Sequence, residues 1–180
     1  MMQKMVRSLR FFRQWHSWIG ICLLIFVILS SLTGLLLAWK KNVDLLQPPT
    51  QSASADDRPW LSIPEISQIA QQAFEQAHPE DDSQIDRLDV RPDKGIVKVL
   101  MDNYWEVQVD GYSGEVFSIA RRHSDWIEKV HDGSIISDTF KLWSMNTLGL
   151  GLLLISLTGG WMWWAPRQIR RQKRKHKSTL

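Results

Sequence analysis

The stretch that decides the fold is residues 14–39, QWHSWIGICLLIFVILSSLTGLLLAW. It carries no Lys, Arg, Asp or Glu over 26 residues, and a helix needs about 20 apolar residues to cross the hydrocarbon core of a bilayer. Tryptophans mark both ends, with Trp15 and Trp18 on one side and Trp39 on the other, as in the aromatic belts of membrane proteins. The stretch therefore predicts a transmembrane helix over residues 15–39. No small-x-small cleavage site follows it, so it is expected to remain as an anchor.

A second uncharged stretch, residues 142–166, has the same properties over 25 residues. Trp143 opens this stretch, and Trp161, Trp163 and Trp164 close it. It predicts a second transmembrane helix over residues 143–165, antiparallel to the first. Two buried helices of a soluble protein are the alternative, but both stretches are flanked by arginine, which favours the membrane.

The charges divide the chain into an acidic middle and two basic ends. All 19 acidic residues lie between Asp44 and Asp138, whereas residues 1–14 and 166–180 are basic. Each basic cluster adjoins an uncharged stretch, which indicates contact with a lipid bilayer and not with nucleic acid. By the positive-inside rule both basic ends are cytoplasmic, although Lys40 and Lys41 oppose this orientation. We therefore expect a protein of the bacterial inner membrane whose central domain is periplasmic.

The region between the spans changes from a helical to an alternating pattern. A linker is expected over residues 40–59, and Ser62-Ile63-Pro64-Glu65 then predicts a capped helix that runs to about Ala77. Alternating apolar residues predict four strands after this helix, over residues 85–90, 96–101, 104–110 and 115–120. The helix and this antiparallel meander make up a small domain over residues 60–120, and residues 121–142 form a juxtamembrane segment. The expected fold class is membrane α+β, with two antiparallel transmembrane helices flanking the small domain.

Four motifs in a fixed order resemble the PepSY-associated transmembrane helix family. They are His16-x-Trp18-x-Gly20, the tetrapeptide SLTG at 31–34 and again at 156–159, the hairpin sequence VDGYSGE at 109–115, and Val130-His131-Asp132-Gly133. The resemblance covers nearly the whole chain and implies a PepSY-like fold for residues 60–120. This chain has only two spans, so it lacks the histidines that larger members carry on their extra helices.

The resemblance implies a part in iron acquisition. Larger relatives are implicated in reducing iron–siderophore complexes and bind haem through membrane histidines, and smaller two-span relatives are linked to ferric reduction that feeds ferrous uptake. We accordingly expect haem b to carry electrons to ferric iron, or to an iron–siderophore complex, on the periplasmic side. A ferric (siderophore) reductase activity and a ferrous uptake system as partner follow from the same resemblance.

Three of the five histidines are candidate haem ligands. His16 lies just inside the interfacial Trp15, where polar side chains are costly and usually functional. The alternative for His16 is a side chain that reaches to the lipid headgroups. His131 is expected at the outer interface, and His123, which follows two arginines, is the weakest candidate. The remaining histidines, expected to lie in solvent, are His78 and His176.

Haem binding by these histidines requires a second copy of the chain. His16 and His131 are expected on opposite sides of the bilayer core, roughly 30 Å apart, so one haem cannot take both ligands from one chain. Two helices also cannot enclose a macrocycle. We therefore expect a homodimer whose four spans form a bundle, in which each histidine pairs with its symmetry mate.

Other functions remain consistent with the sequence. The spans could anchor a PepSY binding module that inhibits or modulates a periplasmic protease or another partner through Tyr104, Trp105 and Tyr112, or they could belong to a non-redox accessory subunit of a transporter. The sequence contains no nucleophile elbow, Walker loop or Cys-x-x-Cys pair, so catalysis would depend on a bound redox cofactor. A short acidic run is a weak site for a hard cation such as ferric iron, and a solvated turn is its simpler interpretation; its residues are Glu80, Asp81, Asp82 and Asp86.

The repeated SLTG is interpreted as a packing feature. Because the spans are antiparallel, Thr33 and Thr158 are expected roughly 15 Å apart in depth and cannot form one site. Both hydroxyls are expected to bond to carbonyls of their own helices. Small residues that would let a neighbouring helix approach closely are Ser30, Gly34, Ser156 and Gly160.

Overall fold

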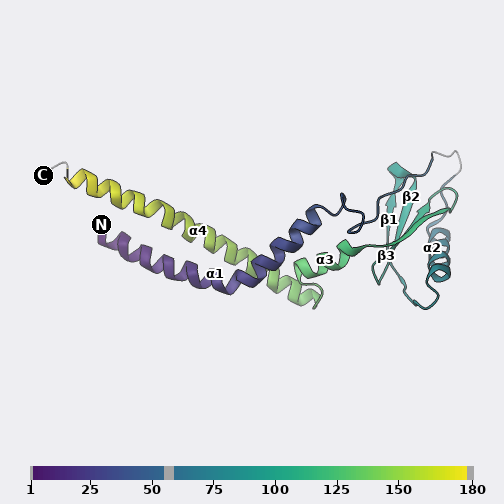
Figure 1. The fold of residues 1–180 in the computed structure, drawn as a ribbon, viewed down its shortest axis with the longest axis horizontal. Coiled ribbons are helices and arrows are strands. Elements are labelled where there is room, and N and C mark those ends of the chain that lie inside the picture. Colours follow the sequence, from purple (N-terminus) through teal and green to yellow (C-terminus); the bar gives the residue numbers. More distant parts are fainter. Residues whose placement is uncertain (1, 55–58, 178–180) are drawn as a thin grey trace. The chain divides into compact units, whose positions relative to one another are not determined.

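The computed structural model describes residues 2–54 and 59–177, which divide into two compact units. The helical unit contains Met1–Thr33 and Lys129–Leu180, the α+β unit contains Gly34–Glu128, and each is described by itself. The elements, most of which are labelled in Figure 1, are in chain order α1 (Met2–Ala38), α2 (Ile63–Ala77), β1 (Ile85–Arg91), the short 3-10 helix η1 (Pro92–Lys94), β2 (Ile96–Met101), β3 (Trp105–Asp110), β4 (Val116–Arg121), α3 (His123–Asp132) and α4 (Asp138–Lys177).

Helices α1 and α4 are both long and apolar enough to cross a bilayer. Only 11% of the most apolar window of α1 and 22% of that of α4 are buried within the chain, so most of their apolar surface needs lipid or another helix to cover it. Both helices extend into the basic ends of the chain, because the Lys, Arg, Gln, Met and Leu residues there are strong helix formers.

The contacts between α1 and α4 show that the two helices pack antiparallel. Phe12 lies against Trp161, with ring centroids 6.0 Å apart. About three turns further along α1, Leu23 fills the space beside Gly151 on α4. Each step forward along α1 is therefore matched by a step back along α4. A Cβ atom at Gly151 would overlap the Leu23 side chain, so this glycine permits the close approach.

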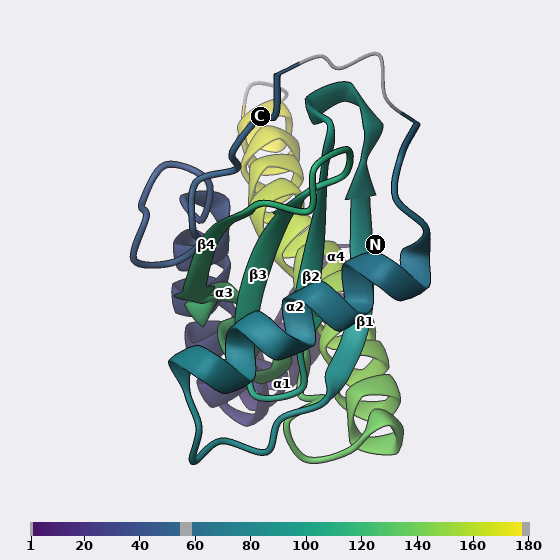
Figure 2. The same ribbon diagram turned by 90° about the vertical axis from the view of Figure 1, so that its right-hand side faces the viewer.

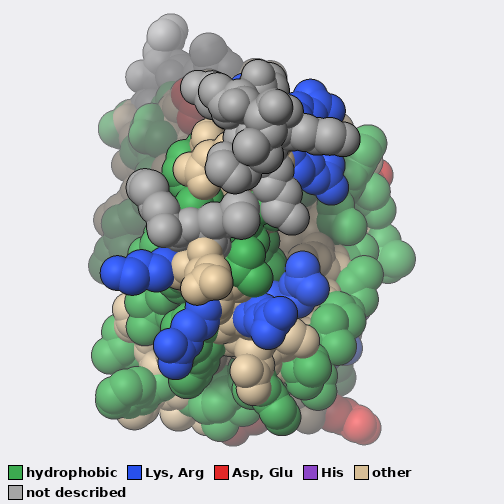
Figure 3. All heavy atoms as spheres, turned by 90° about the vertical axis from the view of Figure 1, so that its left-hand side faces the viewer, with side chains coloured by type: hydrophobic (Ala, Val, Ile, Leu, Met, Phe, Trp, Pro, Cys, Tyr) green, Lys and Arg blue, Asp and Glu red, His purple; other side chains and the backbone are tan. Residues whose placement is uncertain are grey.

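The antiparallel packing brings the two basic ends of the chain to the same end of the helix pair. Figure 3 shows Lys and Arg side chains gathered on this face among apolar ones. The exposed basic residues described there are Lys4, Arg7, Arg10, Arg13, Arg167, Arg170, Arg171 and Arg174. No acidic residue occurs in α1, and the one in α4 is Asp138 at its first residue, so this end is purely cationic.

The α+β unit is a four-stranded antiparallel meander in the order β1-β2-β3-β4, with α2 across one face (Figure 2). The predicted start of α2 is confirmed: the hydroxyl of Ser62 accepts a hydrogen bond from the Glu65 amide, and the Glu65 carboxylate accepts one from the Ser62 amide. The core between helix and sheet contains Ile66, Ala70, Phe74, Val97, Val99, Met101, Val107 and Val109. Alternation of side chains along β2 and β3 directs every second residue to this core.

The predicted strand over residues 96–101 is confirmed as β2, and the other three differ from the observed strands by one residue at one or both ends. β3 begins at Trp105 and not at Tyr104, because Tyr104 has a left-handed backbone with φ 72° and belongs to the turn. The turn between β1 and β2 is the 3-10 helix η1, which Gly95 caps with φ 66°. Only glycine adopts that conformation without strain, so the β1–β2 hairpin depends on this residue.

The second face of the sheet carries a buried polar network. Glu106 is fully buried, and its Oε1 accepts hydrogen bonds from Lys98 Nζ at 2.9 Å and Gln108 Nε2 at 2.8 Å. Its Oε2 accepts from Arg122 at 2.9 Å. The segment after α1 covers this face, because Gln108 donates to the Pro49 carbonyl and accepts from the Gln51 amide. The linker expected over residues 40–59 is therefore packed against the sheet where the structure describes it.

Candidate functional site

Two histidine–threonine pairs form the candidate site of the helical unit. In the first, Nδ1 of His16 on α1 lies 2.7 Å from Oγ1 of Thr158 on α4. The antiparallel packing of the helices brings these residues together although 142 positions separate them in the chain. His16 is half-buried and Thr158 is buried, so the contact is shielded within the helix pair.

The second pair joins the other SLTG threonine to the other candidate histidine. Nδ1 of His131, near the end of α3, lies 2.9 Å from Oγ1 of Thr33 on α1. Thr33 is buried and His131 is half-buried, as in the first pair. The two pairs are reciprocal, because α1 contributes the histidine to one and the threonine to the other.

The threonine hydroxyls determine which histidine nitrogen carries the proton. Thr33 Oγ1 donates to the Leu29 carbonyl at 2.7 Å, and Thr158 Oγ1 donates to the Leu154 carbonyl at 2.7 Å, as predicted from the sequence. A hydroxyl has one hydrogen to donate, so when that hydrogen is assigned to the helix carbonyl, the oxygen accepts from the histidine. From this assignment we infer that Nδ1 is protonated in both histidines and that Nε2 carries the lone pair. This is the arrangement of a metal-ligating histidine whose second nitrogen is held by an outer partner.

The loop after α3 holds His131 in place. Gly133 has φ 83°, and a Cβ atom there would come within 2.9 Å of Ser144 Oγ and 3.0 Å of Phe140, so the chain can reverse here only with glycine. Asp132 accepts a hydrogen bond from the Ser134 amide at 2.9 Å and pairs with Lys141 on α4. Burial raises the pKa of the Asp132 carboxyl, but the hydrogen bonds from Lys141 and Ser134 outweigh it and hold that pKa below its usual range.

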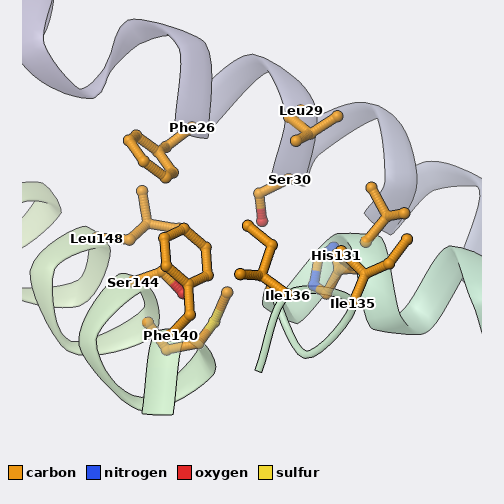
Figure 4. Close-up of a pocket in the computed structure, with 12 residues that line it drawn as sticks. Phe26, Leu29, Ser30, His131, Ile135, Ile136, Phe140, Ser144 and Leu148 are labelled. Atoms are coloured by element: carbon orange, nitrogen blue, oxygen red, sulfur yellow. The ribbon is translucent and has the colours of Figure 1, made fainter. Parts of the chain in front are cut away.

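A cavity of about 250 Å³ opens beside His131 within the helical unit. Figure 4 shows Phe26 and Ser30 of α1 and Phe140 and Ser144 of α4 around it, with Ile135 and Ile136 from the loop after α3. Its lining is almost wholly apolar, and its polar side chains among the described residues are His131, Ser30 and Ser144. The cavity is slightly smaller than the range of about 300–1,000 Å³ that encloses drug-sized ligands.

The His16 end of the unit contains an unpaired donor. The indole Nε1 of Trp161 is buried and makes no hydrogen bond within the described chain. Trp161 lies one turn of α4 from Thr158, and its ring packs on those of Phe12 and Trp164. A buried N–H without an acceptor is rare. The indole N–H of Trp161 is therefore available to donate a hydrogen bond to a ligand oxygen at this end.

Of the other predicted site residues, Ser30 lies beside the second pair, and the rest do not join either pair in the described structure. His123 is the first residue of α3 and belongs to the α+β unit, with no partner among the described residues. Ser30 lines the cavity beside His131, and Gly34 is half-buried in α1. Ser156 and Gly160 are exposed on α4, and a Cβ atom added at Gly160 would have no neighbour within 4 Å in the described chain. Their predicted role in helix packing therefore stays a prediction about contact with another chain.

The acidic run and the aromatic residues of the α+β unit mostly serve local structure. Asp81 accepts hydrogen bonds from Ser83 and Asn103, which fits the solvated-turn interpretation. Nowhere in the described ranges do three or more His, Cys, Asp or Glu side chains gather as a metal site.

The aromatic residues of this unit pack on one another. Trp105 packs against Phe74 and His78, so His78 lies in a ring stack rather than free in solvent. Tyr112 packs against Trp60.

These features define an α+β protein anchored by a pair of transmembrane helices. The family model of the PepSY-associated TM region matches residues 13–180, so the chain belongs to this family and is a membrane protein. No curated protein matches the chain with significance.

The threonine partners are the functional residues that sequence reasoning missed. The sequence assigns Thr33 and Thr158 only to their own helix backbones, although both stand in the same SLTG motif. The sequence contains two SLTG threonines and two candidate histidines close to the apolar stretches. This equal number is the signal that could have suggested one threonine for each histidine.

Proposed function

We propose that the protein is an inner-membrane PepSY protein that supports iron acquisition by haem-linked electron transfer to ferric iron on the periplasmic side. The observation that carries the proposal is the pair of His–Thr contacts, each of which leaves a histidine Nε2 free to bind iron. Ferric iron, free or in a siderophore, is the proposed substrate, and the ferrous product would pass to a ferrous uptake system.

Two features of the helical unit support haem b as the cofactor. His16 and His131 would hold the group through Nε2, and the lining beside His131 is apolar, as a haem site requires. The unpaired Trp161 Nε1–H could donate a hydrogen bond to a carboxylate oxygen of the same group. When bound, haem supplies one-electron chemistry, because its iron is stable in both the ferric and the ferrous state.

Neighbouring residues of the chain would orient and shield His16 and His131 for that chemistry. Thr33 and Thr158 hold the imidazole rings in one tautomer and orientation, so little reorganisation is needed when a ligand binds. The apolar side chains around His131 would keep water away from a bound group and so limit side reactions there. Asp132 and Lys141 fix the loop that carries His131.

A homodimer supports this proposal better than a monomer. His16 and Thr33 are 17 positions apart on α1, so the two pairs are separated by roughly 25 Å along the helix. One chain therefore offers one histidine at each depth, whereas bis-histidine ligation needs two. A second copy would supply the symmetry-related histidine and the missing walls of the 250 Å³ cavity. The exposed Ser156 and Gly160 would allow that copy to approach closely.

The proposed direction of electron flow follows from charge. The cationic end of the helix pair would face the cytoplasm by the positive-inside rule. His16 then lies toward the cytoplasmic donor and His131 toward the periplasm, so the two sites would relay electrons outward.

The experiment is haem-replete expression and purification of the full chain, its H16A and H131A variants and an H123A control. The wild-type protein and H123A should show a Soret band, and each of the other variants should lose about half of the bound haem. Membranes carrying H16A or H131A should reduce ferric iron more slowly in a ferrous-chelator assay. A wild-type protein without Soret absorbance, or unchanged reduction in both variants, would refute the proposal and favour a membrane-anchored binding module.

A further inference from the structure

The α+β unit contains a polar cavity that the proposed redox function does not use. It has a volume of about 370 Å³ and lies where the segment after α1 meets β1, η1 and β2. That volume is within the range of small-molecule sites. Its lining residues are Lys41, Gln47, Pro48, Pro49, Thr50, Arg91, Asp93, Lys94 and Lys98. Four of them are cations and one is an acid, so the cavity favours an anion.

Lys98 brings a buried ammonium group to this cavity, and Glu106 is its ion-pair partner. Its side chain is only 2% exposed, and Nζ donates one hydrogen bond, to Glu106. An ammonium group has three donors, so two remain without a partner among the described residues. Desolvated donors of this kind are costly unless an acceptor fills the site.

The outer cations add to this charge. Arg91 is neutralised by Asp89, with its guanidinium 2.8 Å from the carboxylate. Lys41 and Lys94 make no ion pair with any residue in the described ranges. Asp93 is exposed and is the one carboxylate in the lining as described. Lys41 and Lys94 are therefore the charges that a bound anion would neutralise.

Gln47 and Thr50 add polar groups that an anion alone would not use. The amide oxygen of Gln47 is buried and accepts no hydrogen bond within the described chain. A ligand that satisfies it must donate an O–H or N–H. The hydroxyl of Thr50 can donate or accept. The wall that carries both residues is fixed, because Gln108 binds the Pro49 carbonyl and the Gln51 amide.

From these groups we propose that the cavity binds a small hydroxycarboxylate, an anion that carries both carboxylate oxygens and a hydroxyl donor. The carboxylates bind Lys98, Lys41 and Lys94, and the hydroxyl donates to Gln47 Oε1. Pre-positioned donors and a fixed wall reduce the ordering cost of binding. This inference does not depend on haem or on electron transfer.

The test uses the full chain in a neutral detergent and isothermal titration with citrate. We expect one citrate per chain and binding that weakens as ionic strength rises. The K41Q/K94Q double variant should bind at least tenfold more weakly. The control is K4Q/R7Q, which removes two exposed cations elsewhere and should bind like the wild type. Absent citrate binding, or equal binding by K41Q/K94Q and wild type, would overturn the proposal.

Three further probes test the ligand class. The wild type should bind tricarballylate, which is citrate without its hydroxyl, more weakly than it binds citrate. Q47L lacks the amide acceptor, so it should not bind tricarballylate more weakly than citrate. Inorganic phosphate should compete poorly. Phosphatidylglycerol vesicles, compared with phosphatidylcholine vesicles, should not displace citrate. Equal affinity for tricarballylate and citrate, tighter phosphate binding or displacement by phosphatidylglycerol would each contradict a hydroxycarboxylate site. Circular dichroism of each variant establishes that a loss of binding does not come from unfolding.

Discussion

Thr158 Oγ1 lies 2.7 Å from His16 Nδ1 while donating its own hydrogen to the Leu154 carbonyl. With that hydrogen assigned to the carbonyl, the threonine is an acceptor for the histidine, and we infer that this arrangement favours the Nδ1–H tautomer. The same logic applies to Thr33 and His131. A helix carbonyl, a hydroxyl and an imidazole thus form a short chain of hydrogen bonds at each end of the helix pair.

The first prediction concerns the tautomers themselves. In protein labelled with ¹⁵N-histidine and kept free of haem, His16 and His131 should both be protonated at Nδ1 when neutral. T158V should remove this preference for His16 alone, and T33V should remove it for His131 alone, because each valine lacks the acceptor oxygen. Long-range ¹H–¹⁵N NMR spectra in detergent distinguish the two tautomers.

The serine variants T158S and T33S are the matched controls, since they keep the hydroxyl and should keep the Nδ1–H tautomer. An unchanged His16 tautomer in T158V would show that the threonine does not set it. A change at both histidines in one variant would indicate loss of the helix pair and not of one hydrogen bond.

The second prediction concerns the close approach at Gly151. G151A should destabilise the helix pair by about 1–3 kcal/mol, because the added Cβ overlaps the buried Leu23 side chain. G149A is the control: a Cβ atom at Gly149 would have no neighbour within 4 Å in the described chain, so alanine should be neutral or slightly stabilising through helix propensity. Thermal unfolding in detergent measures both.

The double variant L23A/G151A tests the cause. Removing the leucine side chain relieves the overlap, so the double variant should be less destabilised than the sum of the two single variants. Strictly additive effects would mean that the two residues do not meet.

Local signals in the sequence are sufficient to predict most elements of the fold, but not α3, which lies in the segment described only as juxtamembrane. The uncharged length of 14–39 marks an apolar helix, and Ser62 with Glu65 marks the start of α2, because each signal lies within one element. The period of two in residues 96–101 and 105–110 likewise predicts the central strands. The same alternation wrongly places the turn residue Tyr104 in a strand, because its positive φ leaves no trace in the pattern.

The His–Thr pairs could not be predicted in the same way. They depend on how α1 is rotated and shifted against α4, and many small residues offer a close approach. α1 packs through Leu23 against Gly151 and not against Gly160, and with this packing His16 lies beside Thr158. The polar network under the linker is equally non-local, since Lys98 and Glu106 are paired by strand register and Pro49 by a distant segment.

The third prediction concerns pH and the Asp132–Lys141 ion pair. The pKa of Asp132 is lower in the folded protein than the value of about 3.9 expected for an unfolded chain. Its contribution to stability is therefore present above about pH 4 and is lost as the pH falls through the lower folded-state pKa. Melting temperatures of wild type and D132N should differ at pH 6 and converge toward pH 3.

D102N is the control, because Asp102 is exposed and its side chain makes no hydrogen bond in the described structure. Its difference from wild type should be small at both pH values. A D132N difference that stays constant between pH 6 and pH 3 would show that the ion pair does not contribute through its charge.

The fourth prediction concerns the buried pair under the linker. E106Q should destabilise the α+β unit by about 3–5 kcal/mol, because it leaves Lys98 as a buried charge without its carboxylate and weakens the bond to Arg122. The double variant K98M/E106L replaces both charges by apolar groups and should recover much of this loss, since no buried charge is left at position 98. Chemical denaturation of the full chain, followed by tryptophan fluorescence, compares the variants.

R87Q is the control. It removes an exposed cation paired with Asp86 and Asp125 and should cost less than about 1 kcal/mol. If E106Q proves no more harmful than R87Q, water must reach Lys98 freely, and the cavity beside it would be open to solvent and not a desolvated anion site.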